Sequence, residues 1–363
     1  MTSIAFYGSS ILSAYWNGAA TYYRGMLRAL AAEGYAITFY EPDVLDRQNN
    51  RDIEPPSWCD VVVYDGTVEG LKAAAARAAE ADIVVKASGV GFEDDLVLAE
   101  VMKAARPDAL RIFWDVDAPA TLAEMQTAPD HPLRRTLPDL DLVLTYGGGD
   151  PVVSAYRDLG ARECVPIYNA LDPDTHHPAP PQERFRGDLA FLGNRLPDRD
   201  ARVEEFFLRP AKQTPEARFL LGGSGWDAYP LPRNVHLLGH VRTADHNALN
   251  CTPRMVLNVA RDSMAKNGYS PATRVFEAAG AGACLITDAW EGIELFLEPG
   301  EEVLVARDGE DVAEILKTLP DDAPQQIGAR ARARVLAEHT YADRAKQADA
   351  LFRAHAPRLE AAS

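Results

Sequence analysis

The feature that most constrains this chain is a regular alternation of short, β-branched apolar runs with longer segments of helical pattern. The run SIAFY, near the start, is followed by TYYRGMLRALAAEG, whose apolar residues recur with a helical period until Gly34 ends the pattern. Further strand-like runs in the first half lie at residues 36–40, 61–64, 83–86, 110–114, 142–146 and 164–168. Strands that alternate with helices are joined by crossovers, so this order predicts a parallel sheet with helices packed on it.

The alternation stops at residues 172–188 and then begins again. The segment DPDTHHPAPPQERFRGD is rich in proline and charge and has no apolar period, which is typical of a linker. New strand-like runs lie at residues 189–192, 219–221, 236–238, 255–259, 284–287 and 303–305. We therefore predict an α/β protein with two doubly wound, Rossmann-like domains that face a cleft, residues 1–171 and 189–338. A helical tail, residues 339–363, is expected to pack back on the first domain.

Composition narrows the classes of partner. Acidic residues outnumber basic ones by 54 to 37, a formal net charge of -17, whereas binding to nucleic acid needs clustered Lys and Arg. The start, MTSIAFYGSS, has no basic secretion-signal segment, and no apolar run reaches the roughly 20 residues that cross a bilayer. The four cysteines are widely spaced and form no metal or redox motif. We expect no nucleic acid partner, no integral membrane association, no metal site and a cytoplasmic location.

The richest candidate site is the segment NGYSPATRVFEAAGAGACLITD. Pro271 stands where a helix should begin, with Ser270 as its N-cap, and Thr273 and Arg274 lie in the first turn. A helix N-terminus with a guanidinium beside it suits a diphosphate, because N–H donors, dipole and charge act together. Glu277 lies one turn further and can accept hydrogen bonds from a ribose diol. The alternative is an ordinary helical salt bridge between Arg274 and Glu277.

Two glycine turns follow other strands of the second half. Gly193, Asn194 and Arg195 come directly after residues 189–192, and a glycine turn with an adjacent Arg is a second candidate phosphate contact. The loop LLGGSGW contains Gly223, which would let a ligand approach the backbone, and Trp226, which could cover a base or a sugar. The alternatives are an ordinary strand-to-helix turn and a packed tryptophan.

Several segments of the sequence resemble those of a known family. The stretch SPATRVFEAAGAGACLITDAWEGIELFLEPGEEVLVA and the later HTYADRA, with YNALDPDTHHP, DLAFLGNRLPDR and FWDVDAP, resemble the CgeB-like glycosyltransferases, relatives of the retaining family-four enzymes. The resemblance implies the GT-B fold, a nucleotide-diphosphate sugar as donor, and no cofactor or essential metal. It is strongest over residues 168–345.

The resemblance also assigns roles. Related retaining enzymes bind the donor through a Glu-x7-Glu pattern, whose second glutamate, on the ribose, aligns with Glu277. The first would fall at Tyr269, which is not acidic, so the sugar contacts and the stereochemical outcome stay open. Glu291 lies in the loop that, in relatives, faces the transferred sugar and phosphates. His240 lies in HLLGHV, which resembles a segment that frames the base, although a packing role is the alternative.

The first half is expected to hold the acceptor. Asp115 and Asp117 lie in FWDVDAP at the tip of a strand, where a carboxylate with a raised pKa can act as general base toward an acceptor hydroxyl. The alternatives are a weak metal site and a cap of the next helix. Trp16, Asn17 and Gly18 are expected to form a loop that approaches the donor phosphates across the cleft.

The function predicted is glycosyl transfer from a nucleotide-sugar donor to an unidentified acceptor, which is a glycan, a protein or a small molecule. Arg195, Arg274 and the helix N-terminus would stabilise the diphosphate leaving group, so Arg274 counts with Asp115 and Asp117 as a candidate catalytic residue. The alternatives are an epimerase of nucleotide sugars on the same fold, and a binding protein without turnover.

Overall fold

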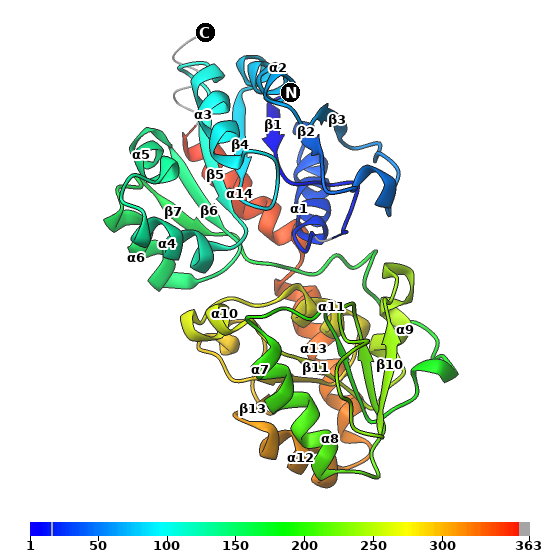
Figure 1. Ribbon diagram of the computed structural model, residues 1–363. Helices are drawn as coiled ribbons and strands as arrows, with labels where there is room; N and C mark the ends of the chain where they lie inside the picture. The colour runs from blue at the N-terminus through cyan, green and yellow to red at the C-terminus, as the bar shows by residue number, and fades with distance from the viewer. Residues whose placement is uncertain (16, 356–363) are drawn as a thin grey trace. The chain divides into compact units, whose positions relative to one another are not determined.

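The chain folds into two compact units. The computed structural model describes residues 1–15 and 17–355. The first unit contains Met1–Asn169 and the helix that begins at Tyr341, and the second is Ala170–Thr340 (Figure 1). The chain therefore passes between the units twice, after Asn169 and after Thr340. Residues 172–188, which we predicted as a linker, fall within the second unit.

The first unit is built on a parallel sheet whose strand order is β3-β2-β1-β4-β5-β6-β7. Its strands, among the described residues, are β1 (Ser3–Tyr7), β2 (Ala36–Asp43), β3 (Asp60–Asp65), β4 (Ile83–Ala87), β5 (Leu110–Asp115), β6 (Leu142–Thr145) and β7 (Cys164–Pro166). The order reverses between β1 and β4, which pair directly with each other. This reversal is the switch point at which doubly wound sheets bind ligands.

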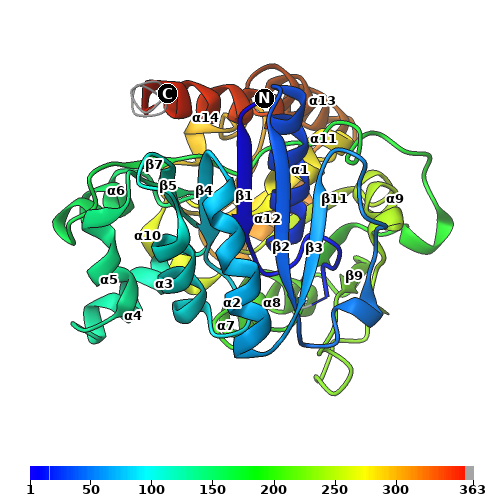
Figure 2. The same ribbon diagram turned by 90° about the horizontal axis from the view of Figure 1, so that it is seen from above.

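Helices cover both faces of this sheet because successive strand residues point to opposite sides. Phe6 packs on Tyr23 of α1, with ring centroids 5.5 Å apart, while the hydroxyl of Tyr7 donates to the carbonyl of Ala74 in α2. Figure 2 shows α14 beside α1, where the Tyr35 hydroxyl donates to Asp349 Oδ1 at 2.8 Å. The helices of the unit are α1 (Ala20–Ala32), α2 (Val68–Ala76), α3 (Asp94–Ala104), α4 (Ala118–Thr127), α5 (Pro132–Thr136), α6 (Gly149–Asp158) and α14 (Tyr341–His355).

The second unit repeats the plan with a parallel sheet of order β10-β9-β8-β11-β12-β13. Its switch point lies between β8 and β11, which pair from Met255 with Leu189 to Leu257 with Phe191. The strands described are β8 (Leu189–Leu192), β9 (Phe219–Gly222), β10 (Val235–Gly239), β11 (Met255–Asn258), β12 (Leu285–Asp288) and β13 (Leu304–Ala306).

The helices of the second unit include one long irregular element after β8. It runs as α7 (Asp200–Val203), a π-helical turn (Glu204–Leu208) and α8 (Arg209–Gln213), and its Phe207 packs between Phe191 and Phe219. The remaining helices are α9 (His246–Cys251), α10 (Asp262–Asn267), α11 (Thr273–Ala281), α12 (Gly309–Thr318) and α13 (Ala323–Glu338).

The predicted fold class is confirmed. Each strand-like run in the sequence corresponds to a strand, with ends that differ by up to three residues, and both sheets are parallel and doubly wound. The tail is helical, as predicted, up to His355; residues 356–363 lie outside the described residues. All four cysteines are free. No helix in the described part of the chain combines the length and apolarity needed to span a bilayer.

Candidate functional site

Three arginines gather at the carboxyl end of the second sheet, near its switch point. Arg199 follows β8, Arg261 follows β11, and Arg274 lies in the first turn of α11. Burial lowers the pKa of Arg199, and the neighbouring charges of Arg261 and Arg274 lower it further against the opposing attraction of Asp198. A half-buried guanidinium beside two others of the same charge is electrostatically unfavourable, and the carboxylates of Asp198 and Glu277, each paired with one of the three arginines, offset this only in part.

The hydrogen bonds of this cluster are incomplete. Arg199 donates from Nη2 to the carbonyl of Asn194, and Arg274 donates from Nη1 to Asn250 Oδ1 at 3.2 Å. The Nε atoms of both arginines are buried and make no hydrogen bond within the described protein. Arg261 differs because its Nε is paired with Asp198 Oδ2 at 2.6 Å. Buried donors are normally satisfied, so these two N–H groups mark a place where a polar ligand fits.

Glu277 lies directly beside this arginine cluster. Its side chain is 7% exposed, with Oε2 3.4 Å from Arg274 Nη1 and Oε1 3.8 Å from His176 Nε2. Burial alone would raise the pKa of Glu277, but the positive charge of Arg274 and the two imidazoles of His176 and His246 lower it to about 2. The side chain is therefore a carboxylate at neutral pH, as a hydrogen-bond acceptor for a diol requires.

Two histidines at this position were missed by the sequence reasoning. The rings of His176 and His246 lie 6.4 Å apart near Glu277, and burial together with the charge of Arg274 lowers the pKa of His246 to about 4. Each Nδ1 is buried and makes no hydrogen bond within the described protein. His176 lies in the segment predicted as a linker, and no local pattern shows that it meets Glu277, about a hundred positions away.

The start of α11 differs from the prediction. Ala272, not Ser270, is the N-cap residue, and it makes no side-chain capping bond. The Ser270 hydroxyl donates instead to the carbonyl of Gly268 at 2.9 Å, so this side chain is turned back into the preceding loop. Thr273 is the first helical residue, and its side chain hydrogen-bonds to Glu277, which lowers the pKa of that carboxyl further. The helix N-terminus beside Arg274 is thus present, but it begins two residues later than predicted.

The two glycine turns pack against each other. A Cβ on Gly223 would lie 2.2 Å from the carbonyl oxygen of Gly193, and the φ of Gly223 is +118°. A Cβ on Gly193 would meet Arg199 Nη2 at 2.8 Å. Asn194 Oδ1 accepts from the amide of Ser224 at 2.9 Å, which ties the two loops together. The close approach that requires these glycines is therefore between loops of the protein, whereas we had predicted an approach of the ligand.

Three further candidates on the donor side are exposed or make contacts outside the arginine cluster. Trp226 is 1% exposed and donates from Nε1 to the carbonyl of Gly193, so the prediction that it covers a base or sugar is wrong and the packing alternative holds. Arg195 is exposed and paired with Asp200 at 2.7 Å. His240 is an exposed residue just after β10.

Tyr269 and Glu291, two of the candidate residues, contact each other. Tyr269 donates from its hydroxyl to Glu291 Oε1 at 2.9 Å, and its amide donates to the carbonyl of Glu291 at 2.6 Å. Tyr269 has a φ of +50°, a conformation that non-glycine residues adopt rarely and that clusters at functional sites. A Cβ on Gly292 would meet the Tyr269 ring at 2.3 Å, so this glycine makes room for the tyrosine.

Comparisons with known proteins agree with this architecture. Residues 199–350 match the family model for glycosyl transferase-like proteins. Sucrose-phosphate synthase from Thermosynechococcus elongatus superposes with a TM-score of 0.72 at 15% identity, over 100% of both chains. HepE from Anabaena, solved with UDP and glucose, gives 0.72 at 15% identity, over 97% of this chain and 100% of that one. The chain has the GT-B fold of these glycosyltransferases.

A third match has the same GT-B architecture. The catalytic domain of starch synthase IV from Arabidopsis thaliana, solved with ADP and acarbose, superposes with a TM-score of 0.70 at 11% identity, over 98% of this chain and 99% of that one. No curated protein sequence matches the chain. The family model covers the segment from Arg199 to the middle of α14, and so includes Arg261, Arg274 and Glu277.

In the first unit, Asp115 is buried and its carboxylate is hydrogen-bonded to other protein groups. It is fully buried, and its Oδ1 accepts from Ser88 Oγ at 2.7 Å, the Asp117 amide at 2.9 Å and Thr121 Oγ1 at 3.1 Å. Its Oδ2 accepts from the Tyr156 hydroxyl at 2.5 Å. Burial raises the pKa of Asp115 against these hydrogen bonds, which lower it. A carboxylate with four protein donors has no free position for an acceptor hydroxyl, so the structure speaks against Asp115 as general base.

Asp117 and Gly18 are the remaining candidates. Asp117 is half-buried at the N-cap position of α4, where its carbonyl accepts from the amides of Ala120 and Thr121, but its side chain makes no capping hydrogen bond. Gly18 is exposed, and a Cβ there would meet nothing within 4 Å. Trp16 lies outside the described residues. Asp117 is thus the candidate base that the structure leaves in place.

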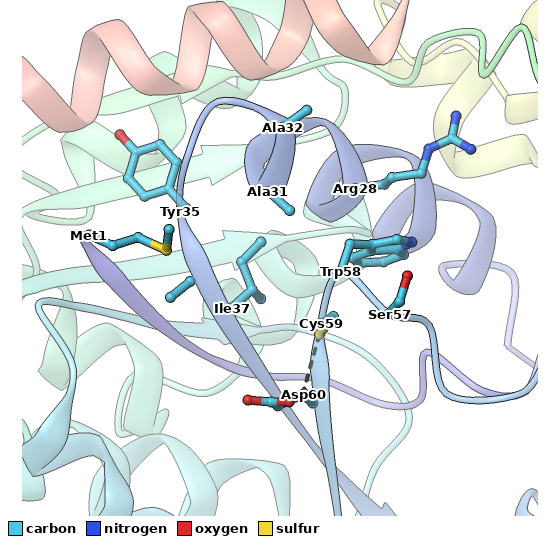
Figure 3. Close-up of a pocket in the computed structure, with 11 residues that line it drawn as sticks. Met1, Arg28, Ala31, Ala32, Tyr35, Ile37, Ser57, Trp58, Cys59 and Asp60 are labelled. Carbon is cyan, nitrogen blue, oxygen red and sulfur yellow. Dashed lines mark hydrogen bonds between the residues drawn. The ribbon is translucent and has the colours of Figure 1, made fainter.

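A separate hollow of about 470 Å³ opens at the amino ends of β2 and β3 (Figure 3). Arg28, Tyr35 and Trp58 line it, with Cys59 donating to the Asp60 carbonyl at its floor. None of the predicted site residues lines this hollow. Ligands of doubly wound sheets bind at the opposite, carboxyl ends of the strands, so we do not assign the donor to it.

Proposed function

We propose that the protein transfers a sugar from a nucleoside-diphosphate donor to an acceptor hydroxyl. The observation that carries this proposal is the pair of buried, unbonded Nε–H groups on Arg199 and Arg274, at the switch point of the second sheet. Arg274 is already paired with Glu277 at 3.4 Å, so what calls for a ligand is the unused hydrogen-bonding capacity of these two Nε–H groups, and a diphosphate offers several acceptor oxygens to them.

The remainder of the donor follows from the neighbours of these arginines. Glu277, held ionised beside Arg274, would accept the hydroxyls of the ribose, and Tyr269 with Glu291 would contact the sugar. UDP and glucose in HepE, and ADP in starch synthase IV, support a nucleotide sugar as the class of donor. The stretch from Ser270 to Ala306 supports the narrower CgeB-like subgroup.

The chemistry proposed is electrostatic. The bond between the sugar C1 and the diphosphate oxygen breaks while a bond from the acceptor oxygen to C1 forms, and negative charge grows on the departing diphosphate. Arg199 and Arg274, with the N-terminus of α11, stabilise that charge without a metal ion. The proton of the acceptor hydroxyl passes to a base, for which Asp117 is our candidate.

A thermal-shift panel of UDP, GDP, ADP, CMP and dTDP sugars tests the proposal. A nucleotide present at 100 times its Kd should add about 2.7 kcal/mol of stability. Arg274→Ala should remove that shift, whereas Arg307→Ala, an exposed arginine paired with Asp311 in the same unit, should keep it. A panel in which no nucleotide stabilises the wild type contradicts the proposal, and isomerised donor without transfer would point to an epimerase.

A further inference from the structure

The loop that follows β1, residues 8–18, is held by one buried carboxylate. Glu41, in β2, is completely buried. Its Oε2 accepts from the amides of Ile11 at 2.6 Å and Leu12 at 3.3 Å, and its Oε1 accepts from Ser10 Oγ at 2.9 Å. Gln48 Nε2 also donates to Oε1, at 2.8 Å. Four donors thus converge on Glu41, and three of them belong to the loop.

A second set of contacts fixes the other half of the loop. Asp52 Oδ1 accepts from the Ala14 amide at 2.9 Å, while its carboxylate is paired with Arg24 of α1 at 2.7 Å. Asn17, 7% exposed, donates from Nδ2 to the carbonyls of Ser10 and Ser13 at 2.8 and 3.0 Å. The amides of the loop therefore donate to side chains of β2 and of the segment after it, and its carbonyls accept from a side chain of the loop itself.

Arg47 joins this loop to the loop after β4. It is completely buried, and its Nη1 donates to the carbonyls of Ser9 and Val90, at 3.2 and 2.7 Å. These two loops flank the switch point between β1 and β4. Burial lowers the pKa of Arg47, and the charge of Glu41 opposes that effect. The polar network therefore lies beneath the edge of the sheet at which ligands of this fold bind.

Burying this polar network costs free energy, and its hydrogen bonds fix the conformation of the loop after β1. Buried polar groups are unfavourable unless paired. Both oxygens of Glu41 are paired, whereas Nε and Nη2 of Arg47 are buried without a hydrogen bond within the described protein. The bonds to Glu41 therefore favour one conformation of the loop. Among the described residues at the tip of the loop, Tyr15 is 45% exposed, and a Cβ on Gly18 would meet nothing within 4 Å. A loop with a buried polar base and an exposed tip is organised before a ligand arrives, which reduces the entropy lost on binding.

We propose that Glu41 is a positioning residue for glycosyl transfer, which sets the conformation of residues 9–15 so that their exposed end at Tyr15 contacts the reacting substrates. This inference rests on the proposed function, but it concerns the first unit and not the donor cluster. Glu41 itself is too deeply buried to touch substrate, so it acts only through the loop amides.

The test is Glu41→Gln, which keeps the volume of the side chain but turns an NH₂ group toward donors that need an acceptor. With the nucleotide sugar chosen by the thermal-shift panel and water as acceptor, we expect kcat for release of the nucleoside diphosphate to fall at least tenfold. The stabilisation by the nucleotide alone should be unchanged. Hydrogen exchange at the amides of Ile11 and Leu12 should quicken. Asp52→Asn, which weakens the bond to the Ala14 amide and the pair with Arg24 but leaves the four bonds to Glu41 in place, should show a smaller fall in kcat.

Asp82→Asn is the matched control. Asp82 accepts from the Ser3 amide and hydroxyl at 2.8 Å, at the amino end of the same sheet, so its loss should lower stability and leave kcat unchanged. Wild-type kcat in Glu41→Gln, or an equal fall in Asp82→Asn, would overturn the inference. A wild type that neither binds a nucleotide nor releases one would instead overturn the proposed function.

Discussion

Replacing Arg199 by methionine should leave the unliganded protein nearly as stable as the wild type. The substitution removes a hydrogen bond to the Asn194 carbonyl and a cation–π contact with Phe191, which together contribute about 1–2.5 kcal/mol. It also removes a buried Nε–H without a partner, which costs about 1–3 kcal/mol, and repulsion from Arg261 and Arg274. These effects nearly cancel, so the free energy of unfolding should change by no more than about 1 kcal/mol.

The same substitution should strongly weaken binding of the nucleotide. One charge-assisted hydrogen bond contributes about 1.5–3 kcal/mol, so its loss raises Kd by roughly 13- to 160-fold. At a concentration that is 100 times the wild-type Kd, the stabilisation by the ligand should fall from about 2.7 kcal/mol to about 0.3–1.3 kcal/mol. For a unit of this size, the ligand-induced shift in Tm should fall from roughly 5–11 °C to roughly 1–5 °C.

The assay is thermal unfolding with and without the nucleoside diphosphate, followed by titration calorimetry for Kd. Arg307→Met is the control, because Arg307 is an exposed arginine of the same unit whose partner is Asp311. A full ligand-induced shift in Arg199→Met would refute the reasoning, since the guanidinium would then not contact the diphosphate. A large loss of stability without ligand would refute the claim that its charge is uncompensated.

Three other predictions address the remaining candidates. The pKa of Glu277 is about 2 in the folded protein and 4.5 in the unfolded chain, so the ionised side chain stabilises the fold by on the order of 3 kcal/mol. This contribution is present above about pH 4.5 and is lost as pH falls toward 2. Urea unfolding across that range should show the loss in the wild type and not in Glu277→Gln. Gly223→Ala should lower stability by at least about 2 kcal/mol, because the new Cβ meets the Gly193 carbonyl at a φ of +118°, whereas Gly18→Ala should be neutral for stability in the same denaturation assay. Asp115→Asn should lower stability by about 2 kcal/mol or more, while Asp117→Asn should lower kcat and leave nucleotide binding intact; equal kcat in Asp117→Asn and wild type would exclude Asp117 as base.

The fold could be predicted because its signals are local. Runs such as SIAFY and DLAFLG are short, apolar and β-branched or aromatic, and each is separated by a helical segment from the next. Parallel pairing and the doubly wound order then follow from the crossover rule. The contact between Arg274 and Glu277 could also be predicted from the sequence, because residues three apart on a helix are neighbours.

The parts that could not be predicted depend on contacts between distant segments. Arg199 lies in LPDRD, which reads as a polar turn, and only the packing of the loops after β8 and β11 buries its side chain beside Arg274. The position of His176 beside Glu277 could not be predicted for the same reason, because it depends on packing between distant segments. Trp226 was misjudged because a tryptophan after three glycines looks exposed, whereas a hydrogen bond to the Gly193 carbonyl draws it into the core. Ser270 was misjudged because Pro271 and Ala272 delay the helix by two residues.

The placement of α14 has a consequence for how the chain is made. The helix packs on α1, where a Cβ on Gly25 would meet the Tyr341 ring at 2.2 Å and where Phe352 lies against Tyr35. Residues 341–355 leave the ribosome after Ala170–Thr340, so the first unit waits for a missing helix while the second unit is already synthesised in one stretch. Domains usually fold as units in the order of translation. In this chain the order is reversed: the unit that begins second is the first whose residues are all available to fold.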